Sequence, residues 1–301
     1  MQVPSITIKP IIDLDGCRHF QEVQRRIWSS SEIDLIPLHV LITMAKNGSV
    51  FLGAYSPDGP AETGEMVGFV LGWLGTTSGD PATQTPPRLK HCSHIAGVLP
   101  GWQGSGIGVR LKLAQREAVL AQGLTDHVTW TYDPLYRVNG AFNIHRLGAT
   151  CTTYVRNIYG EMSDALNAGV PTDRCQVDWH LRSLRVLQAI AETAAGAPPQ
   201  TNARPKWDNA NLHFLSVQLS PDGLPRPVPV SPNFDGTVIA LPLPDDVKAI
   251  RKFDQGLLLE WRLFLRDVLE PAFAAGYALV DCVSFVGRGW HYILTPAARE
   301  V

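Results

Sequence analysis

The fold of this chain is decided by the stretch Val98-Leu99-Pro100-Gly101-Trp102-Gln103-Gly104-Ser105-Gly106-Ile107-Gly108. Residues 94–98 read as the end of a strand, and apolar residues recur at helical spacing from Ile107 to Ala118. Gly123 then occupies a position where helices often end in a left-handed residue. The layout is therefore strand, glycine-rich turn, helix. Such a turn leaves backbone N–H groups unpaired at the positive end of the helix dipole, so we expect an anion cradle, with a diphosphate favoured.

The turn differs from two common phosphate-binding loops. It lacks the Gly-Lys-Ser/Thr ending of a nucleotide-triphosphate loop and the G-x-G-x-x-G spacing of a dinucleotide-binding loop. It matches V-x-P-x-x-Q/R-x-x-G-x-G, with these places filled by Val98, Pro100, Gln103, Gly106 and Gly108. In this it resembles the coenzyme A signature of the GNAT acyltransferase superfamily. A purely structural turn and a site for another phosphate-bearing cofactor remain as alternatives.

Composition limits the classes of protein that fit. The chain has 301 residues, 45% hydrophobic and 18% charged, which suits one large or two ordinary globular domains. Its formal net charge of -2 gives no reason to expect nucleic acid or an anionic membrane as a partner. No secretory signal and no membrane-spanning apolar run are visible, so we expect a cytoplasmic protein. The five cysteines form no C-x-x-C pair, so neither a disulfide framework nor a metal site is expected.

The order of the predicted elements extends the resemblance. The patterns predict a strand at 5–10, a helix capped by Asp15, a helix opened by Pro37, strands at 49–55, 65–76 and 88–98, the helix after the turn, a strand at 127–131, a helix at 139–147, and strands at 150–159 and 175–181. This is the element order of the GNAT fold, an α+β fold whose mixed, mostly antiparallel sheet has helices on both faces. Residues 1–182 are therefore predicted to be a GNAT acyl-CoA-binding domain.

The strand–helix–strand unit around the turn predicts parallel pairing with a right-handed crossover. Two such strands that splay apart would leave a slot for an extended ligand arm.

The remainder of the chain is predicted to be an extension. Residues 183–203 read as a helix and a linker, and residues 204–301 as a smaller α+β domain. Its predicted elements are strands at 212–219 and 237–243, a helix capped by Asp245-Asp246, a longer helix ending near Gly276, and a hairpin across Gly287-Arg288-Gly289. The extension either shapes the acceptor site or forms a subunit interface, as in a homodimer, and the sequence does not separate the two.

The resemblance implies transfer of an acyl group from acetyl-CoA or another acyl-CoA to an amine. On the family pattern the cofactor-binding turn comprises Gln103, Gly104, Ser105, Gly106, Ile107 and Gly108, whose backbone N–H groups would hold the diphosphate. The backbones of Ala96 and Val98 would pair with the pantetheine arm, and an N–H near Gly97 or Val98 would face the thioester oxygen. Asn139 resembles the asparagine that opens the later helix and touches the pantetheine.

Two side chains are candidates for the catalytic base, which is useful because most of a lysine-like amine is protonated at neutral pH. His94 is the first, because strand alternation places it on the face of Ala96 and Val98, with His91 on the opposite face. Its alternative role is that of a strand histidine bonded to a neighbour. Asp133 is the second candidate, and its alternative role is to form the turn that follows.

The chain departs from the family at one place. Many GNAT enzymes carry Tyr-x-x-x-Gly at the end of the helix after the crossover strand, and that tyrosine protonates the leaving thiolate. Here Ile144 takes the place of the tyrosine before Gly148. Tyr154, Tyr159 or solvent would then supply the proton, or the protein binds CoA without fast turnover.

A further resemblance is to a less-studied bacterial branch of GNAT proteins with a similar extension. It is carried by residues 130–135, Asn143, Gly148, residues 159–160 and residues 173–174. Members of that branch are linked to N-acylation, including N-succinylation, of free amino acids. The resemblance implies an N-acyltransferase that moves an acetyl or succinyl group to a small-molecule amine, with an amino acid favoured over a protein. An arginine fork would suit the acid's carboxylate, with Arg137, Arg146, Arg156 and Arg174 as candidates. The alternative is a non-catalytic CoA-binding regulatory or scaffold protein.

Overall fold

The computed structural model describes residues 5–28, 35–79, 84–160, 169–194, 207, 212–220 and 222–297. Its contacts divide the chain into two compact units, residues 1–130 and 131–301, and the division falls inside strand β5 (His127–Tyr132). The expected α+β class is found, and the elements from β1 to β7 follow the predicted order. The domain boundary after residue 182 stays a prediction; in the structure the residues on either side of it belong to the second unit.

The first unit is built on the strands β1-β2-β3-β4-β5, in that order. Neighbouring strands run antiparallel except β4 and β5, which are parallel, as the crossover prediction requires. The elements are β1 (Thr7–Pro10), α1 (Leu14–Trp28), α2 (Leu38–Lys46), β2 (Val50–Tyr55), β3 (Met66–Thr76), β4 (Leu89–Val98) and α3 (Ile107–Gln122), with short 3-10 turns at Ala61–Thr63 and Pro100–Trp102.

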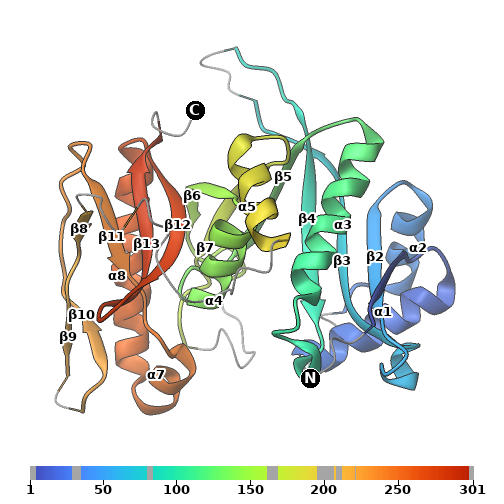
Figure 1. Ribbon diagram of the computed structural model, residues 1–301, viewed down its shortest axis with the longest axis horizontal. Helices are drawn as coiled ribbons and strands as arrows, with labels where there is room; N and C mark the ends of the chain where they lie inside the picture. Colours follow the sequence, from blue (N-terminus) through green and yellow to red (C-terminus); the bar gives the residue numbers. More distant parts are fainter. Residues whose placement is uncertain are drawn as a thin grey trace. The chain divides into compact units, whose positions relative to one another are not determined.

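Helices α1 and α3 cover opposite faces of this sheet. The ring of Phe20 in α1 lies 4.2 Å from that of Phe69 in β3. A Cβ on the preceding residue, Gly68, would lie 3.3 Å from Leu111 of α3 and 3.2 Å from Val98. Because successive strand residues point to opposite faces, the two helices lie on opposite sides. Figure 1 shows α3 running along β3 and β4.

Helix ends in the first unit follow local capping chemistry. The prediction that Asp15 caps α1 is wrong: Gly16 N–H donates to Asp13 Oδ1 at 2.8 Å, because Asp13 is the residue directly before the helix. Asp15 pairs with Arg18 instead, at 3.2 Å. Gly123 ends α3 with φ of 69°, as predicted.

The second unit carries the strand order β7-β6-β12-β13-β11-β8, and a separate two-stranded pair, β9 with β10. Strand β6 pairs with β12 at Cys151 and Leu279, so the predicted GNAT strands β6 and β7 share a sheet with strands of the extension. The elements are β6 (Thr150–Val155), β7 (Arg174–His180), α5 (Leu184–Ala194), β8 (Leu212–Phe214), β9 (Val217–Leu219), β10 (Pro225–Pro227), β11 (Val238–Pro242), α7 (Val247–Phe253), α8 (Gln255–Ala274), β12 (Tyr277–Phe285) and β13 (Gly289–Pro296).

Several predictions for the extension are confirmed. Asp246 caps α7 by accepting from Ala249 N–H, and the predicted hairpin is formed by β12 and β13. The single strand predicted at 212–219 is instead two short strands, β8 and β9, in different sheets. The linker predicted at 194–202 begins at the last residue of α5, Ala194, and the rest of it lies outside the described residues. Among the described helices, none combines the length and the apolar character needed to cross a membrane.

Candidate functional site

The turn between β4 and α3 is held by its own side chains. Gln103 Nε2 donates to Val98 O at 3.0 Å, and Ser105 Oγ donates to Trp102 O at 2.6 Å. Gln103 N–H donates to Pro100 O at 3.3 Å, so this N–H is already engaged within the turn. The two polar side chains therefore tie the start of α3 to the end of β4.

The glycines of the turn leave donors open to solvent. Gly104 and Gly106 have φ of 80° and 83°, and a Cβ on either would meet no atom within 4 Å. Within the described part of the chain, no hydrogen bond engages the N–H of Gly104 or Gly106. Ile107 and Gly108 start α3, where N–H groups have no acceptor one turn earlier. These donors lie at the positive end of the helix dipole, which is the arrangement that the predicted anion cradle requires.

The edge of β4 that faces β5 is free over most of its length. In the described residues, β4 pairs with β5 only at His91 with Val128 and Cys92 with Thr129, whereas β3 pairs along the whole of β4. Beyond Cys92 no described residue pairs as a strand with the β5-facing edge of β4, which includes Ala96 and Val98. The two parallel strands therefore splay apart, and the free edge leads directly into the turn.

A β-bulge in β4 lies at His94. Gly72 of β3 pairs with Ser93 and Leu71 pairs with Ile95, so His94 is the unpaired extra residue. A bulge places two successive residues on one side of the strand and resets the alternation beyond it.

The bulge corrects the predicted orientation of His94. Its ring lies 4.8 Å from that of Trp73, which by alternation shares with Phe69 the face covered by α1. Val98, and with it Ala96, faces α3. His94 therefore does not share a face with Ala96 and Val98. It is exposed to solvent, and burial of part of its ring lowers its pKa, so the neutral, proton-accepting form dominates at neutral pH.

A buried polar cluster lies where β4 and β5 part. The amine of Lys112, 3% exposed, donates to Ser93 Oγ at 3.0 Å and Gln115 Oε1 at 2.9 Å, and lies 3.5 Å from the centre of the Trp130 ring. Gln115 Nε2 lies 3.2 Å from Nε2 of His91. Burial lowers the pKa of Lys112 well below its usual range, and burial together with Lys112 lowers the pKa of His91 to about 4. These hydrogen bonds fix α3 to β4.

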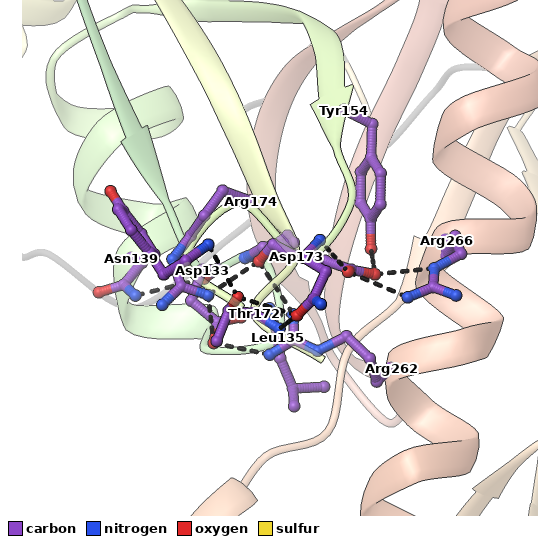
Figure 2. Close-up of polar contacts among 12 residues, drawn as sticks. Asp133, Leu135, Asn139, Tyr154, Thr172, Asp173, Arg174, Arg262 and Arg266 are labelled. Atoms are coloured by element: carbon purple, nitrogen blue, oxygen red, sulfur yellow. Dashed lines mark hydrogen bonds and ion pairs between the residues drawn. The ribbon is translucent and has the colours of Figure 1, made fainter. Parts of the chain in front are cut away.

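In the second unit, Asp133 is engaged by an arginine of α8. Arg262, 1% exposed, donates to both carboxylate oxygens of Asp133 at 2.8 and 2.7 Å, and Leu135 N–H donates to Asp133 Oδ1 at 2.9 Å (Figure 2). Arg174 lies 3.5 Å from the same carboxylate. The turn-forming role that the sequence left open for Asp133 is thus present, together with a buried ion pair.

Asp173 forms a second centre beside this pair. It accepts from Arg266 at 2.8 and 3.0 Å and from Tyr154 Oη at 2.8 Å (Figure 2). Burial tends to raise the pKa of Asp173, but these hydrogen bonds outweigh it and lower that pKa. Burial and Asp173 raise the pKa of Tyr154, so this phenol is a poor proton donor to a thiolate.

Asn139 lies in a helix that begins two residues earlier than predicted. Helix α4 (Arg137–Gly140) continues as a π-helical turn, η4 (Ala141–Arg146). Asn139 Nδ2 donates to Asp133 O at 3.3 Å, so these two predicted site residues are neighbours. Ile144, at the family's tyrosine position, is fully buried, and His145 Nδ1 lies 2.8 Å from Asp281 Oδ1.

The predicted site residues thus form two groups. The first group is contiguous in the first unit and comprises His94, Ala96, Val98 and the turn from Gln103 to Gly108. The second group belongs to the second unit and comprises Asp133 and Asn139. Sequence reasoning missed Lys112 and Arg262. Both have a signal in the helical period: Lys112 precedes Gln115 and Val119 on the buried face of α3, and Arg262 falls between Leu258 and Leu265 on that of α8.

Comparisons with known proteins concern the fold. No protein-family model matches the sequence, and no curated protein matches it. NAA60 of Arabidopsis thaliana in complex with a bisubstrate analogue is 14% identical with a TM-score of 0.45, over 58% of this chain and 97% of that one. The ribosomal-protein-S18-alanine N-acetyltransferase of Escherichia coli is 12% identical with a TM-score of 0.42, over 60% and 96%. An N-acetyltransferase of Staphylococcus aureus Mu50 is 13% identical with a TM-score of 0.43, over 59% and 99%. At this level neither the activity nor the substrate of this chain follows from theirs.

Proposed function

We propose that the chain is an acyl-CoA-dependent N-acyltransferase. The observation that carries the proposal is a continuous line of free backbone groups in the first unit. The edge of β4 beyond Cys92 has no strand partner in the described residues, and it leads to the open N–H groups of Gly104 and Gly106. CoA has the matching chemistry, because its diphosphate suits a helix N-terminus and its pantetheine amides suit a free strand edge.

The reaction is attack of a neutral amine on the thioester carbonyl. A bond forms between nitrogen and the carbonyl carbon, the amine gives up a proton, and the carbon–sulfur bond breaks to release the CoA thiolate. His94 is suited to accept the amine proton, because it is exposed and its lowered pKa keeps it neutral at pH 7. An N–H near Gly97 or Val98 would stabilise the oxyanion, which is worth about 3 kcal/mol in the barrier. Solvent or the exposed Tyr159 then protonates the thiolate, since Ile144 carries no acidic group and Tyr154 is bonded to Asp173.

The acceptor is proposed to be a small-molecule amine, with an amino acid favoured, and the transferred group an acetyl or succinyl group. The net charge of -2 supports a small acceptor over a strongly charged peptide. The sequence resemblance to proteins linked to amino-acid N-acylation supports the same choice.

A non-catalytic CoA-binding role is the second candidate. It is favoured by the fully buried Ile144 at the position where the family has its proton donor. Asp133, the other candidate base, is held in a bidentate pair with Arg262. Of the two candidate bases, only His94 is then accessible to accept a proton, so the catalytic role depends on His94.

The deciding experiment measures thiol release from acetyl-CoA and succinyl-CoA. Each donor is incubated with pooled D- and L-amino acids, with polyamines and with a lysine peptide, beside an enzyme-free control. Release that depends on an acceptor establishes the transferase, and splitting the active pool identifies the acceptor. CoA binding in calorimetry without release favours the non-catalytic role, and absence of both overturns the cradle assignment.

A further inference from the structure

A groove in the second unit lies between α8 and the segment that follows β10. Its volume is about 560 Å³, within the range of small-molecule sites. Both walls are fixed: Trp261 Nε1 of α8 donates to Pro225 O at 2.8 Å, and Val228 N–H donates to Ser216 O at 3.1 Å. The lining residues are Pro227, Pro229, Val230, Ser231, Glu260, Leu263, Phe264 and Asp267.

The groove is open, and part of each wall is apolar. Glu260, Leu263, Phe264 and Asp267 follow the i, i+3, i+4, i+7 spacing of one helix face. Phe264 is buried, whereas Leu263 and, on the opposite wall, Val230 are 36% and 37% exposed. The groove therefore presents apolar surface that a ligand body would cover.

Two carboxylates of α8 line the groove, those of Glu260 and Asp267, and within the described part of the chain only the first is paired with a cation. They stand seven residues apart, about 10 Å along the helix. Glu260 accepts from Arg226 at 2.6 and 2.8 Å and is neutralised. Asp267 is exposed and has no ion pair among the described residues.

The cations close to Asp267 are already engaged. The charge of Asp267 contributes to raising the pKa of Arg156, but the Arg156 side chain donates to both carboxylate oxygens of Glu270. The adjacent Arg266 donates to Asp173. The groove thus has an uncompensated negative charge at its Asp267 end and apolar walls beside it.

We infer that this groove binds an organic cation, an ammonium group on an aryl or alkyl body. The ammonium group lies at Asp267, and the body covers Leu263, Phe264 and Val230. An anion is disfavoured by the carboxylate of Asp267, and a bare metal ion would leave the apolar side chains uncovered. The site goes beyond the proposed acyl transfer and does not depend on it, because its binding is measured without CoA.

The test is isothermal titration calorimetry of the full chain at pH 7 with phenethylammonium chloride. Two partial probes accompany it: 2-phenylethanol, which lacks the charge, and ethylammonium, which lacks the aromatic body. We expect saturable binding of one phenethylammonium per chain, with each partial probe at least about fivefold weaker. Equal affinity for 2-phenylethanol, or no saturable binding of phenethylammonium, would overturn the proposal.

Matched variants locate the site. Asp267→Asn and Leu263→Ser should each weaken phenethylammonium binding at least about fivefold. Asp222→Asn, which removes an exposed carboxylate outside the groove, should leave it unchanged. Equal losses in the two Asn variants would show bulk charge rather than a site. Self-association of the wild type that Leu263→Ser abolishes would show an interface between copies of the chain, and would also overturn the proposal.

Discussion

At the residue scale, the turn before α3 requires two glycines because of their backbone conformation and not because of close packing. Gly104 and Gly106 have space for a side chain, but their positive φ values strain any L residue. The conformation of the turn therefore depends on glycine at both positions.

Gly106→Asp should abolish CoA binding, because it adds backbone strain and places a carboxylate where the diphosphate would lie. The matched control is Gly123→Asp at the other end of α3, where φ is 69° and a Cβ also meets open space. Calorimetry with CoA measures both. Loss in the control alone, or in neither variant, would show that the anion binds elsewhere.

His94→Ala should lower kcat at least about 100-fold and leave the affinity for CoA within about twofold, because the imidazole moves a proton and holds no phosphate. The lowered pKa of His94 places the acidic limb of the wild-type rate profile below pH 6.5, since only the neutral ring accepts a proton. His213→Ala, at an exposed position in the second unit, serves as the control. A parallel loss of kcat and CoA affinity would indicate that His94 packs against Trp73 rather than acting as a base.

At the element scale, the sequence predicted which elements form and their order, because hydrophobic periodicity and glycine positions are local signals. Alternation failed at His94, where a bulge in β4 moved one side chain to the other face. Regular helix geometry failed at Ala141–Arg146, where the turn is π-helical. Each departure inserts one extra residue into a regular backbone repeat. The hydrophobic periodicity of a single sequence does not reveal where such a residue is inserted.

The polar partners were harder to predict than the elements. The helical period puts Arg262 on the apolar face of α8, a signal that sequence reasoning missed, and its bond to Asp133 joins residues 129 apart in the chain. A pattern within one segment says which face is buried, and not which distant group it meets.

Arg262→Ala should destabilise the second unit by about 3–5 kcal/mol, because it leaves the buried Asp133 without its bidentate partner. The double variant Asp133→Leu with Arg262→Met should recover part of this loss, since it removes both members of the bidentate pair, while Arg174 loses its contact with the same carboxylate. Urea unfolding of the wild type, both single variants and the double variant completes the cycle. A cost below about 1 kcal/mol for Arg262→Ala would mean that solvent reaches Asp133.

The cluster between β4 and α3 predicts acid sensitivity. Burial lowers the pKa of His91 from the ordinary histidine value of 6.5 to about 4 in the folded chain, so the unfolded chain binds the proton more readily. The contribution of His91 to stability should therefore be complete above pH 6.5 and fall by about 3 kcal/mol as the pH drops to 4. His91→Gln should remove this contribution and leave that of His291, whose pKa burial also lowers to about 4, whereas His39→Gln at an exposed site of α2 should leave the pH dependence unchanged. Urea unfolding at several pH values gives the slopes, and identical slopes in the two variants would contradict the assignment.

At the scale of the whole molecule, the extension and the last strands of the predicted GNAT domain are one compact unit. Strand β6 pairs with β12, Arg262 of α8 holds Asp133, and Trp179 of β7 is fully buried in the same unit. Composition marked a linker near residue 200 and so suggested two independent domains. Composition does not report strand pairing, and the boundary between compact units in the structure is within β5.

A chain ending at Arg182 tests whether residues 1–182 fold by themselves or need the extension. It lacks β12 and α8, so β6 keeps β7 but loses its neighbour on the other side, and Asp133 loses Arg262. We expect it to be insoluble, or to unfold at a temperature well below that of the full chain, because an unpaired strand edge and an unpaired carboxylate are both exposed. A chain ending at Ala297 keeps every described element and should match the full chain in calorimetry. If the shorter chain instead melts cooperatively at the temperature of the full protein, residues 1–182 have a sufficient core of their own, and the contacts with β12 and α8 add little to their stability.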